Sequence, residues 1–345
     1  MGPEIAVAAV LFAALVLYVL TGGADFGGGV WDLLATGPRA AAQRRVIARA
    51  IGPIWEANHV WLILVIVLLF VCFPVAFARI GTALHWPLTL MLVGVVLRGS
   101  AFVFRTYDSR KDAVQARWSR VFAGASVFTP VMLGISVGAV ASGAVRTTDG
   151  VYTSGFFAPW LAPFPLAVGF FTLALFALLA AVYLADDVED DALREDFRLR
   201  ALGASAAVFV LAWVTFAVSG TGAPHLRASL VGGPIAWTMQ AVVGACGVAL
   251  VGALITRRTR VARILAPIQV VLLVAGWGHA QFPWILMDEL TLHDAAAPDN
   301  VLVGTVGVLA VGAVPLGLAY AWMIRVFRQA RLSGAPSAEA IEANE

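Results

Sequence analysis

Charged residues are scarce in this chain. Aspartate, glutamate, lysine and arginine together make up 13% of its 345 residues, whereas apolar residues make up 61%. An ordinary soluble domain carries about 25% charged and roughly 45–50% apolar residues. So little polar surface cannot cover a water-soluble globule, which excludes the two or three soluble domains that the length alone would suggest.

Cysteine is nearly absent as well. Cys72 and Cys246 both lie in apolar runs, which indicates small buried hydrophobes rather than a disulfide or a metal site. The sequence has no paired-cysteine zinc spacing, no P-loop and no dinucleotide fingerprint. Gly27-Gly28-Gly29 follows an apolar helix rather than a strand, which argues against a phosphate loop.

No lysine or arginine precedes Arg39. The positively charged start of a cleaved signal peptide is therefore missing, and we expect the first helix to be retained.

Long apolar runs dominate the chain instead. Each is about 20 residues long and matches a hydrocarbon core roughly 30 Å thick, so we predict an all-α polytopic membrane protein with about nine transmembrane helices. The predicted spans are 5–24, 53–77, 81–103, 121–143, 158–184, 201–219, 230–255, 264–284 and 301–324, and the longest polar linkers are 32–51, 104–120, 185–200 and 285–300. Residues 1–331 then form a single integral membrane domain, and 332–345 a disordered tail.

Basic residues predict the orientation. Nineteen of the 23 fall in alternate linkers or after the last span, and therefore on one side. They are Arg39, Arg44, Arg45, Arg49, Arg105, Arg110, Lys111, Arg117, Arg120, Arg194, Arg198, Arg200, Arg257, Arg258, Arg260, Arg263, Arg325, Arg328 and Arg331, whereas only Arg79, Arg146 and Arg227 fall on the other side. Because cytoplasmic loops hold the excess of lysine and arginine, we expect an external N-terminus and a cytoplasmic C-terminus in a bacterial inner membrane.

Few ionisable residues fall inside the predicted spans. Asp25 ends the first, Glu56 and His59 open the second, and Arg98 lies near the cytoplasmic end of the third. A charge at the centre of a membrane helix costs roughly 2.5–3.5 kcal/mol on insertion scales, so such residues are candidates for function. The topology places them at one depth, together with the amide of Asn58.

This set is suited to handling protons. Two nearby carboxylates disfavour double ionisation, so one can hold a proton near neutral pH while Arg98 compensates the other. Glu56 and His59 are three residues apart and share a helical face, and the glycines around Asp25 would let a neighbouring helix come close. Structural alternatives remain: Asp25 could face water at a helix end, Glu56 could form an ion pair with Arg98, and His59 and Asn58 could serve helix packing.

Other clusters have simpler interpretations. The segment 277–284, Trp-Gly-His-Ala-Gln-Phe-Pro-Trp, is typical of an interfacial aromatic belt with a helix stop. The acidic residues of the last outer loop, among them Asp288 and Glu289, and the acidic run 186–191 are interpreted as solvated faces.

Three segments resemble subunit II of the cytochrome bd-type quinol oxidases. They are Gly-Ala-Asp-Phe-Gly-Gly-Gly at 23–29, Pro-Ile-Trp-Glu-Ala-Asn-His-Val-Trp-Leu-Ile at 53–63, and Leu-Arg-Gly at 97–99. The segment 276–283 resembles the cyanide-insensitive branch of that family. The resemblance covers essentially the whole chain.

The resemblance implies two four-helix bundles plus one peripheral helix. It also implies a heterodimer with a related subunit I, which carries two b-type haems, one d-type haem and the quinol site and which meets quinol and oxygen. This chain would bind no haem and no metal and would supply no catalytic residue. It would conduct protons at Asp25 and Glu56, with Arg98 nearby. Membrane lipid, a structural quinone and a small accessory subunit are further partners to consider, and nucleic acid is not one.

Two other functions fit parts of the pattern. A proton-coupled secondary transporter also places carboxylates in its helices, but it often has broken helices near the midplane, paired between the two halves. Here the acids lie near one face and no such pair of Gly/Pro breaks occurs. A pure scaffold is the second alternative, in which the charged residues only hold a partner in place.

Overall fold

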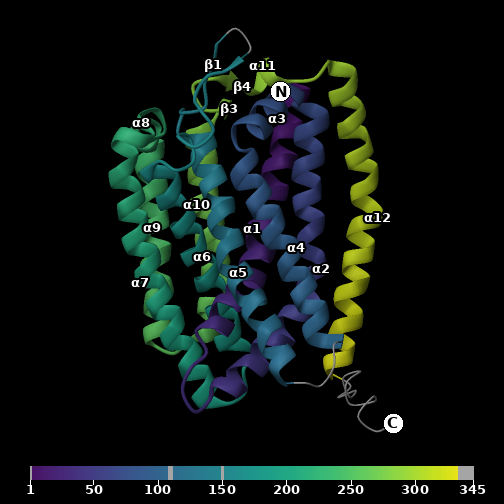
Figure 1. Cartoon of the computed structure of the whole chain (residues 1–345), viewed down its shortest axis with the longest axis vertical. Helices are drawn as coiled ribbons and strands as arrows, with labels where there is room; N and C mark the ends of the chain where they lie inside the picture. The colour runs from purple at the N-terminus through teal and green to yellow at the C-terminus, as the bar shows by residue number, and fades with distance from the viewer. Residues whose placement is uncertain (1, 108–111, 149–150, 333–345) are drawn as a thin grey trace.

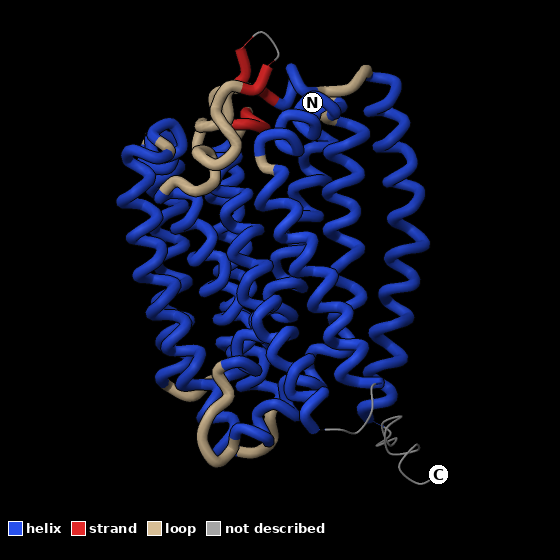
Figure 2. The backbone as a smooth tube through the Cα atoms, in the orientation of Figure 1, coloured by secondary structure: helices blue, strands red, loops and turns tan. Residues whose placement is uncertain are grey.

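The computed structural model describes residues 2–107, 112–148 and 151–332, although the side chains of 51–57, 105–107, 112–116 and several positions beyond 319 are outside that description. Long helices run side by side along the whole molecule, and α1 begins at the end opposite to the one where α12 stops (Figure 1). Short strands and loops gather mainly at the end where α1 begins, here called the N-terminal end (Figure 2).

Nine long helices make up the described part of the chain. They are α1 (Pro3–Leu33), α2 (Ala40–Cys72), α4 (His85–Tyr107), α5 (Asp112–Ala141), α6 (Pro163–Asp187), α7 (Asp191–Gly222), α9 (Pro234–Ile255), α10 (Thr259–Gln281) and α12 (Asp299–Leu332). Within the described residues, eight helices are long and apolar enough to cross a membrane, and a bent pair formed by part of α2 with α3 (Pro74–Ala83) raises the number to nine. The predicted all-α polytopic fold is confirmed.

Several predicted boundaries are wrong. The first span does not stop at residue 24, because α1 continues to Leu33; the glycines at 27–29 are buried against other helices, and that packing offsets their weak helix propensity. The linker predicted at 32–51 is helical from Ala40 onward. The span predicted at 53–77 breaks after Cys72, and the chain turns by 116° into α3 at Pro74. Proline has no N–H for a helix interior but fits a first turn.

The N-terminal end carries the short elements. Strands β1 (Thr147–Thr148) and β2 (Val151–Tyr152) pair antiparallel, as do β3 (Trp284–Leu286) and β4 (Leu290–Thr291), with α8 (Pro224–Val231) and α11 (Leu292–Ala295) beside them. Two of the three arginines predicted for the outer side form ion pairs with acids here. Arg79 Nη1 donates to Glu289 Oε1 at 3.0 Å, and Arg146 Nη2 lies 3.5 Å from Asp288 Oδ2. The interpretation of these two acids as a merely solvated face is therefore wrong.

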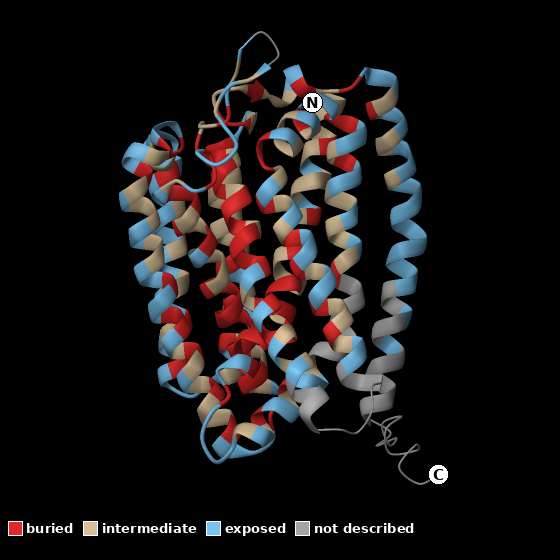
Figure 3. Cartoon of the chain, viewed as in Figure 1, coloured by how far each residue is buried: buried red, intermediate tan, exposed pale blue. Residues whose placement is uncertain are grey.

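Two groups of helices pack against each other. In the first group α1 contacts α2 and α5, and α5 contacts α4; α6, α7, α9 and α10 form the second group, and α1 and α5 pack on α6 between them. Burial is greatest along α6, where Phe176, Leu178 and Leu179 are almost completely enclosed (Figure 3). Helix α12 lies outermost, with Val308 and Val311 about three-quarters exposed at 73% and 75%. Its exposed apolar surface suits contact with lipid.

Candidate functional site

A buried ion pair joins α1 to α4. Arg98 Nη1 donates to Asp25 Oδ2 at 2.7 Å and Nη2 donates to Oδ1 at 2.5 Å, while Nη2 also donates to the Asp25 carbonyl oxygen at 3.1 Å. The two side chains are 1% and 0% exposed. This is the two-pronged geometry in which arginine binds a carboxylate most strongly. Asp25 lies inside a helix and faces protein, so the alternative that it faces water at a helix end is wrong.

Aromatic rings and a hydroxyl fix the guanidinium of Arg98. Its central carbon lies 4.6 Å from the ring centroid of Phe26 and 4.7 Å from that of Phe122. Both distances are within the range of cation–π attraction. Arg98 Nε donates to Ser126 Oγ at 2.9 Å, and Ser126 Oγ donates in turn to the Phe122 carbonyl at 2.7 Å. The planar, forked head group of arginine is what these contacts require, so lysine would not replace it.

Glycines let three helices approach α1 around this pair. A Cβ atom on Gly22 would lie 2.9 Å from Asn58 Oδ1 of α2, and one on Gly29 would lie 2.2 Å from Ser126 of α5. A Cβ on Gly27 would lie 2.0 Å from the carbonyl oxygen of α6 residue Phe176. The prediction that these glycines permit close helix contact is confirmed, and it applies to three neighbours rather than one.

The other predicted site residues all belong to α2. Asn58 is buried and packs against Gly22, one turn of α1 from Asp25. Thr21 Oγ1 donates to Asn58 Oδ1 at 3.5 Å, the upper limit for a hydrogen bond. His59 is partly exposed. The side chain of Glu56 is outside the described residues. The structure therefore brings Asp25, Arg98 and Asn58 into one buried region of the first helix group.

One buried acid was missed by sequence reasoning. Asp32 is 3% exposed and belongs to α1. Because the first span was predicted to end at residue 24, this position was assigned to a linker. The spacing could have revealed it: Asp32 follows Asp25 by seven residues, which is two helical turns, so both acids lie on one face of α1.

Two cavities lie beside this region. The smaller, of about 150 Å³, extends between α1, α2 and α6 toward α10. It is lined by Ala24, Gly28, Ile47, Ala50, Ala180, Tyr183, Leu184, Asp187 and Arg263. The larger, of about 280 Å³, lies mainly within the second helix group and is lined mostly by apolar side chains. The lining residues with polar side-chain atoms are Thr172, Thr215, Ser219, Ser229, Gln240, Trp277 and His279.

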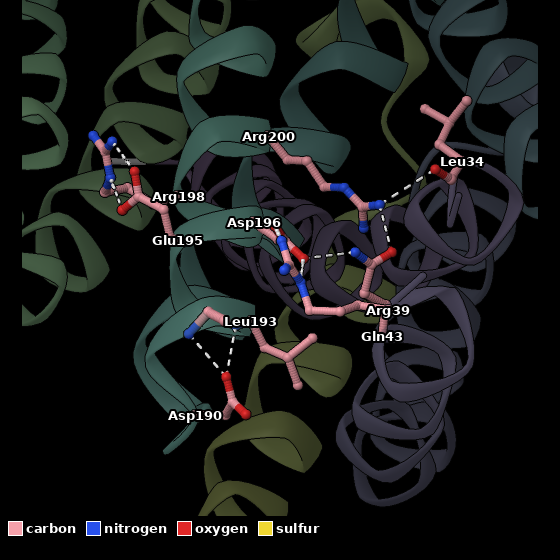
Figure 4. A network of polar contacts seen from close by, with 10 residues as sticks. Leu34, Arg39, Gln43, Asp190, Leu193, Glu195, Asp196, Arg198 and Arg200 are labelled. Atoms are coloured by element: carbon pink, nitrogen blue, oxygen red, sulfur yellow. Dashed lines mark hydrogen bonds and ion pairs between the residues drawn. The ribbon is translucent and has the colours of Figure 1, made fainter. Parts of the chain in front are cut away.

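A polar network ties the α1–α2 connection to α7 at the other end of the molecule, here called the arginine-rich end (Figure 4). Arg39 donates to both carboxylate oxygens of Asp196, at 2.8 and 2.5 Å, and Gln43 Nε2 donates to Asp196 at 2.8 Å. Arg200 Nη2 donates to Gln43 Oε1 at 2.7 Å. The hydrogen bond to Asp196 raises the pKa of Arg39 above its ordinary value.

The acidic run 186–191 lies at the same end and is not simply solvated. Asp186 and Asp187 both form ion pairs with Arg263 of α10. Asp190 caps α7, and its side chain accepts hydrogen bonds from the backbone N–H groups of Ala192 and Leu193 at 2.8 and 3.0 Å. A carboxylate at this position satisfies N–H groups that the helix itself leaves free. These acids fix the α6–α7 connection and do not belong to the buried region around Asp25.

Fold and site together define a class: a polytopic α-helical membrane protein with an arginine–carboxylate pair enclosed in one of its helix groups. Among the described residues, no three histidine, cysteine or acidic side chains gather in an arrangement that could hold a metal ion. The family model for cytochrome bd terminal oxidase subunit II matches residues 3–327. The chain belongs to this family.

Individual relatives agree with this assignment. Cytochrome bd-I ubiquinol oxidase subunit 2 of Escherichia coli (strain K12) is 27% identical over 214 residues, which cover 60% of this chain and 53% of the relative. A putative cytochrome bd menaquinol oxidase subunit II of Bacillus subtilis (strain 168) is 24% identical over 178 residues, 51% of this chain and 50% of the relative. The chain thus spans about half the length of the curated relatives it matches.

A solved structure shows the same fold. A chain from the structure of bd oxidase from Geobacillus thermodenitrificans superposes with a TM-score of 0.77, covering 95% of this chain and 99% of that chain at 22% identity. The resemblance seen in the sequence is confirmed at the level of family and fold.

Proposed function

We propose that this chain is the non-haem subunit II of a bd-type quinol:oxygen oxidoreductase and that it conducts cytoplasmic protons toward the oxygen-reducing haem of subunit I. The observation that carries the proposal is the enclosed Asp25–Arg98 pair, located in two of the sequence motifs by which the chain resembles the family. Family membership favours this function over the secondary transporter.

The energetics of the pair support a functional role. Removing two charges from water costs several kcal/mol per ion, and well-packed apolar side chains of similar volume often serve stability as well or better. Arg98 binds both carboxylate oxygens of Asp25 and holds that side chain in place. Two neighbouring carboxylates disfavour double ionisation, which helps a second carboxylate to hold a proton. We assign that second role to Glu56 in α2, with Asn58 and His59 beside it in the sequence.

The direction of proton uptake has an energetic consequence. Reduction of oxygen to water consumes protons, and protons drawn from the cytoplasm carry charge across part of the membrane. Each elementary charge moved through 100 mV stores about 2.3 kcal/mol. The positive-inside rule predicts that the arginine-rich end lies in the cytoplasm of a bacterium, and Asp25 lies in the half of α1 nearer that end. The proposed path therefore begins on the side from which uptake conserves energy.

The proposed partner is the haem-bearing subunit I, with two b-type haems, one d-type haem and the quinol site. Outward-facing apolar residues on α2 support a large neighbour in the membrane: Val60, Ile63 and Phe70 are 50%, 59% and 58% exposed. They recur at helical spacing and form one stripe. Lipid would cover the rest of the apolar surface. A small accessory subunit would also need an exposed apolar helix face on which to bind.

The 280 Å³ cavity fits the proposed structural quinone. Its apolar lining would hold an isoprenoid chain, and Trp277 Nε1 is buried there without a hydrogen-bond partner among the described residues. Trp277 would donate to a carbonyl oxygen of the quinone head group. A bound quinone would fill the cavity and add stability to the second helix group.

The test is to substitute each acid by its isosteric amide. Asp25→Asn and Glu56→Gln are introduced into the assembled complex, and Asp191→Asn serves as the control because Asp191 is 91% exposed. We expect a large loss of quinol oxidase turnover in the first two variants and none in the control, with unchanged haem spectra. Turnover near wild type in both would refute the proton role. Loss of haem would indicate that the acids support assembly, and a complex with no haem signal at all would favour the transporter.

A further inference from the structure

Asp32 is a buried acid to which the proposed path gives no role. It is 3% exposed and lies on the same face of α1 as Asp25, two turns nearer the arginine-rich end. Seven residues of helix correspond to about 10 Å along the axis. At that separation the two carboxylates cannot share a hydrogen bond, since donor and acceptor must come within about 3 Å of each other.

Asp32 lies just below the aqueous surface of that end. Two residues later α1 reaches its C-cap, Leu34, which is exposed. Exposed Arg44 of α2 covers the end of the helix: its Nη2 donates to the Ala35 carbonyl at 3.2 Å and its Nε donates to the Asp32 carbonyl at 3.5 Å. A proton donated by cytoplasmic water would therefore reach Asp32 before any other acid of α1.

The 150 Å³ cavity lies beside α1 at a level between the two acids, although neither carboxylate is among its lining residues. Gly28, one turn from Asp32 on the same side of α1, lines its wall together with Ala24, the neighbour of Asp25. The far end of the cavity is lined by Asp187, which is exposed, and by Arg263. At roughly 30 Å³ per molecule the volume is sufficient for several waters, which polar groups at its mouth would stabilise.

We propose that Asp32 takes protons from the cytoplasm and passes them through water in this cavity to the region of the Asp25–Arg98 pair. The step is a proton transfer only: Asp32 gains a proton from bulk water and releases it to a bridging water on the inner side. The glycine at position 28 leaves the helix surface open to that water. This inference rests on the proposed function and names where the path begins.

The first test removes the titrating group and keeps its shape. Asp32→Asn in the assembled complex is expected to lower turnover about tenfold or more, somewhat less than the roughly 10²–10⁴-fold attributed to a positioned proton-transfer group, because water can partly bypass it. KM for quinol and the haem spectra should stay as in wild type, and the solvent isotope effect should rise as proton uptake becomes rate-limiting. Asp32→Glu should recover most of the turnover, which a merely structural role would not predict.

The second test blocks the water and leaves every carboxylate in place. Ala50→Leu places a larger side chain in the cavity wall, whereas Ala48→Leu changes an exposed residue that does not line it. We expect slower turnover and a larger isotope effect only for Ala50→Leu. Wild-type turnover in Asp32→Asn, combined with loss in Asp25→Asn, would overturn this inference and leave the proposed function standing. Wild-type turnover in both would overturn both.

Discussion

The buried pair makes a quantitative prediction about stability. Arg98→Met removes three hydrogen bonds to Asp25 and leaves a carboxylate that is 0% exposed without its cation. Breaking a buried pair by removing one partner costs about 3–5 kcal/mol. The variant also loses the attraction of the cation to two aromatic rings. We therefore expect the free energy of unfolding to fall by about 3–5 kcal/mol.

The double variant separates charge burial from packing. Asp25→Asn alone leaves the buried guanidinium of Arg98 without its anion, so it should cost a similar amount. Asp25→Asn combined with Arg98→Met removes both charges and should cost much less than the sum of the two single variants, with a coupling of about 2–3 kcal/mol or more. A surface pair supplies the control: Arg39 is 49% exposed, and Arg39→Met should cost about 0.2–1 kcal/mol.

The assay is a denaturant titration of the purified, detergent-solubilised complex, followed by tryptophan fluorescence. Haem spectra taken in parallel verify that the complex is assembled before unfolding begins. Additive losses in the double variant would refute the reasoning, because additivity means that the two side chains do not stabilise each other. A cost for Arg98→Met as small as that for Arg39→Met would refute it as well.

Three further predictions concern packing, the N-terminal end and the apolar cavity. Gly27→Ala should strongly destabilise the fold, because its Cβ would meet backbone at 2.0 Å, whereas Gly124→Ala, with open space around it, should be neutral or stabilise by up to about 1 kcal/mol in thermal unfolding. Glu289→Ala should free Arg79 and loosen the loops of the N-terminal end, which limited proteolysis would detect as faster cleavage; cleavage at the wild-type rate would contradict this. Trp277→Phe should lower the amount of quinone extracted with the purified complex. An unchanged amount would contradict the proposed hydrogen bond between Trp277 and the quinone.

Much of the membrane architecture was predictable because hydropathy is a local property. The composition excluded a soluble protein, the apolar runs gave the number of spans, and the distribution of arginines gave a consistent orientation. The motif around Asp25 and the motif containing Glu56 pointed to the family that the comparisons confirm. The roles of Glu56, Asn58 and His59 stay predictions.

Helix ends were harder to predict because they depend on what packs against them. Glycines after Asp25 suggested the end of a helix, yet contacts with α5 and α6 keep that segment helical. Because the predicted span ended too early, Asp32 was also assigned to a linker and not recognised as a buried acid. At Pro74 the chemistry of a single residue did decide the outcome, but only the structure gives the 116° turn that follows.

The sequence by itself determined that a few charged groups must be buried at one depth of a membrane protein. A charged residue inside an apolar run can be recognised from the residues next to it in the chain. Only the tertiary structure decided that Asp25 takes Arg98 as its partner and that two phenylalanine rings enclose the cation. Those groups lie on α1, α4 and α5, and Arg98 is 73 residues from Asp25 in the chain. Which side chains meet across such a distance depends on how the helices pack, and the close approach that glycines allow is a property of the assembled bundle.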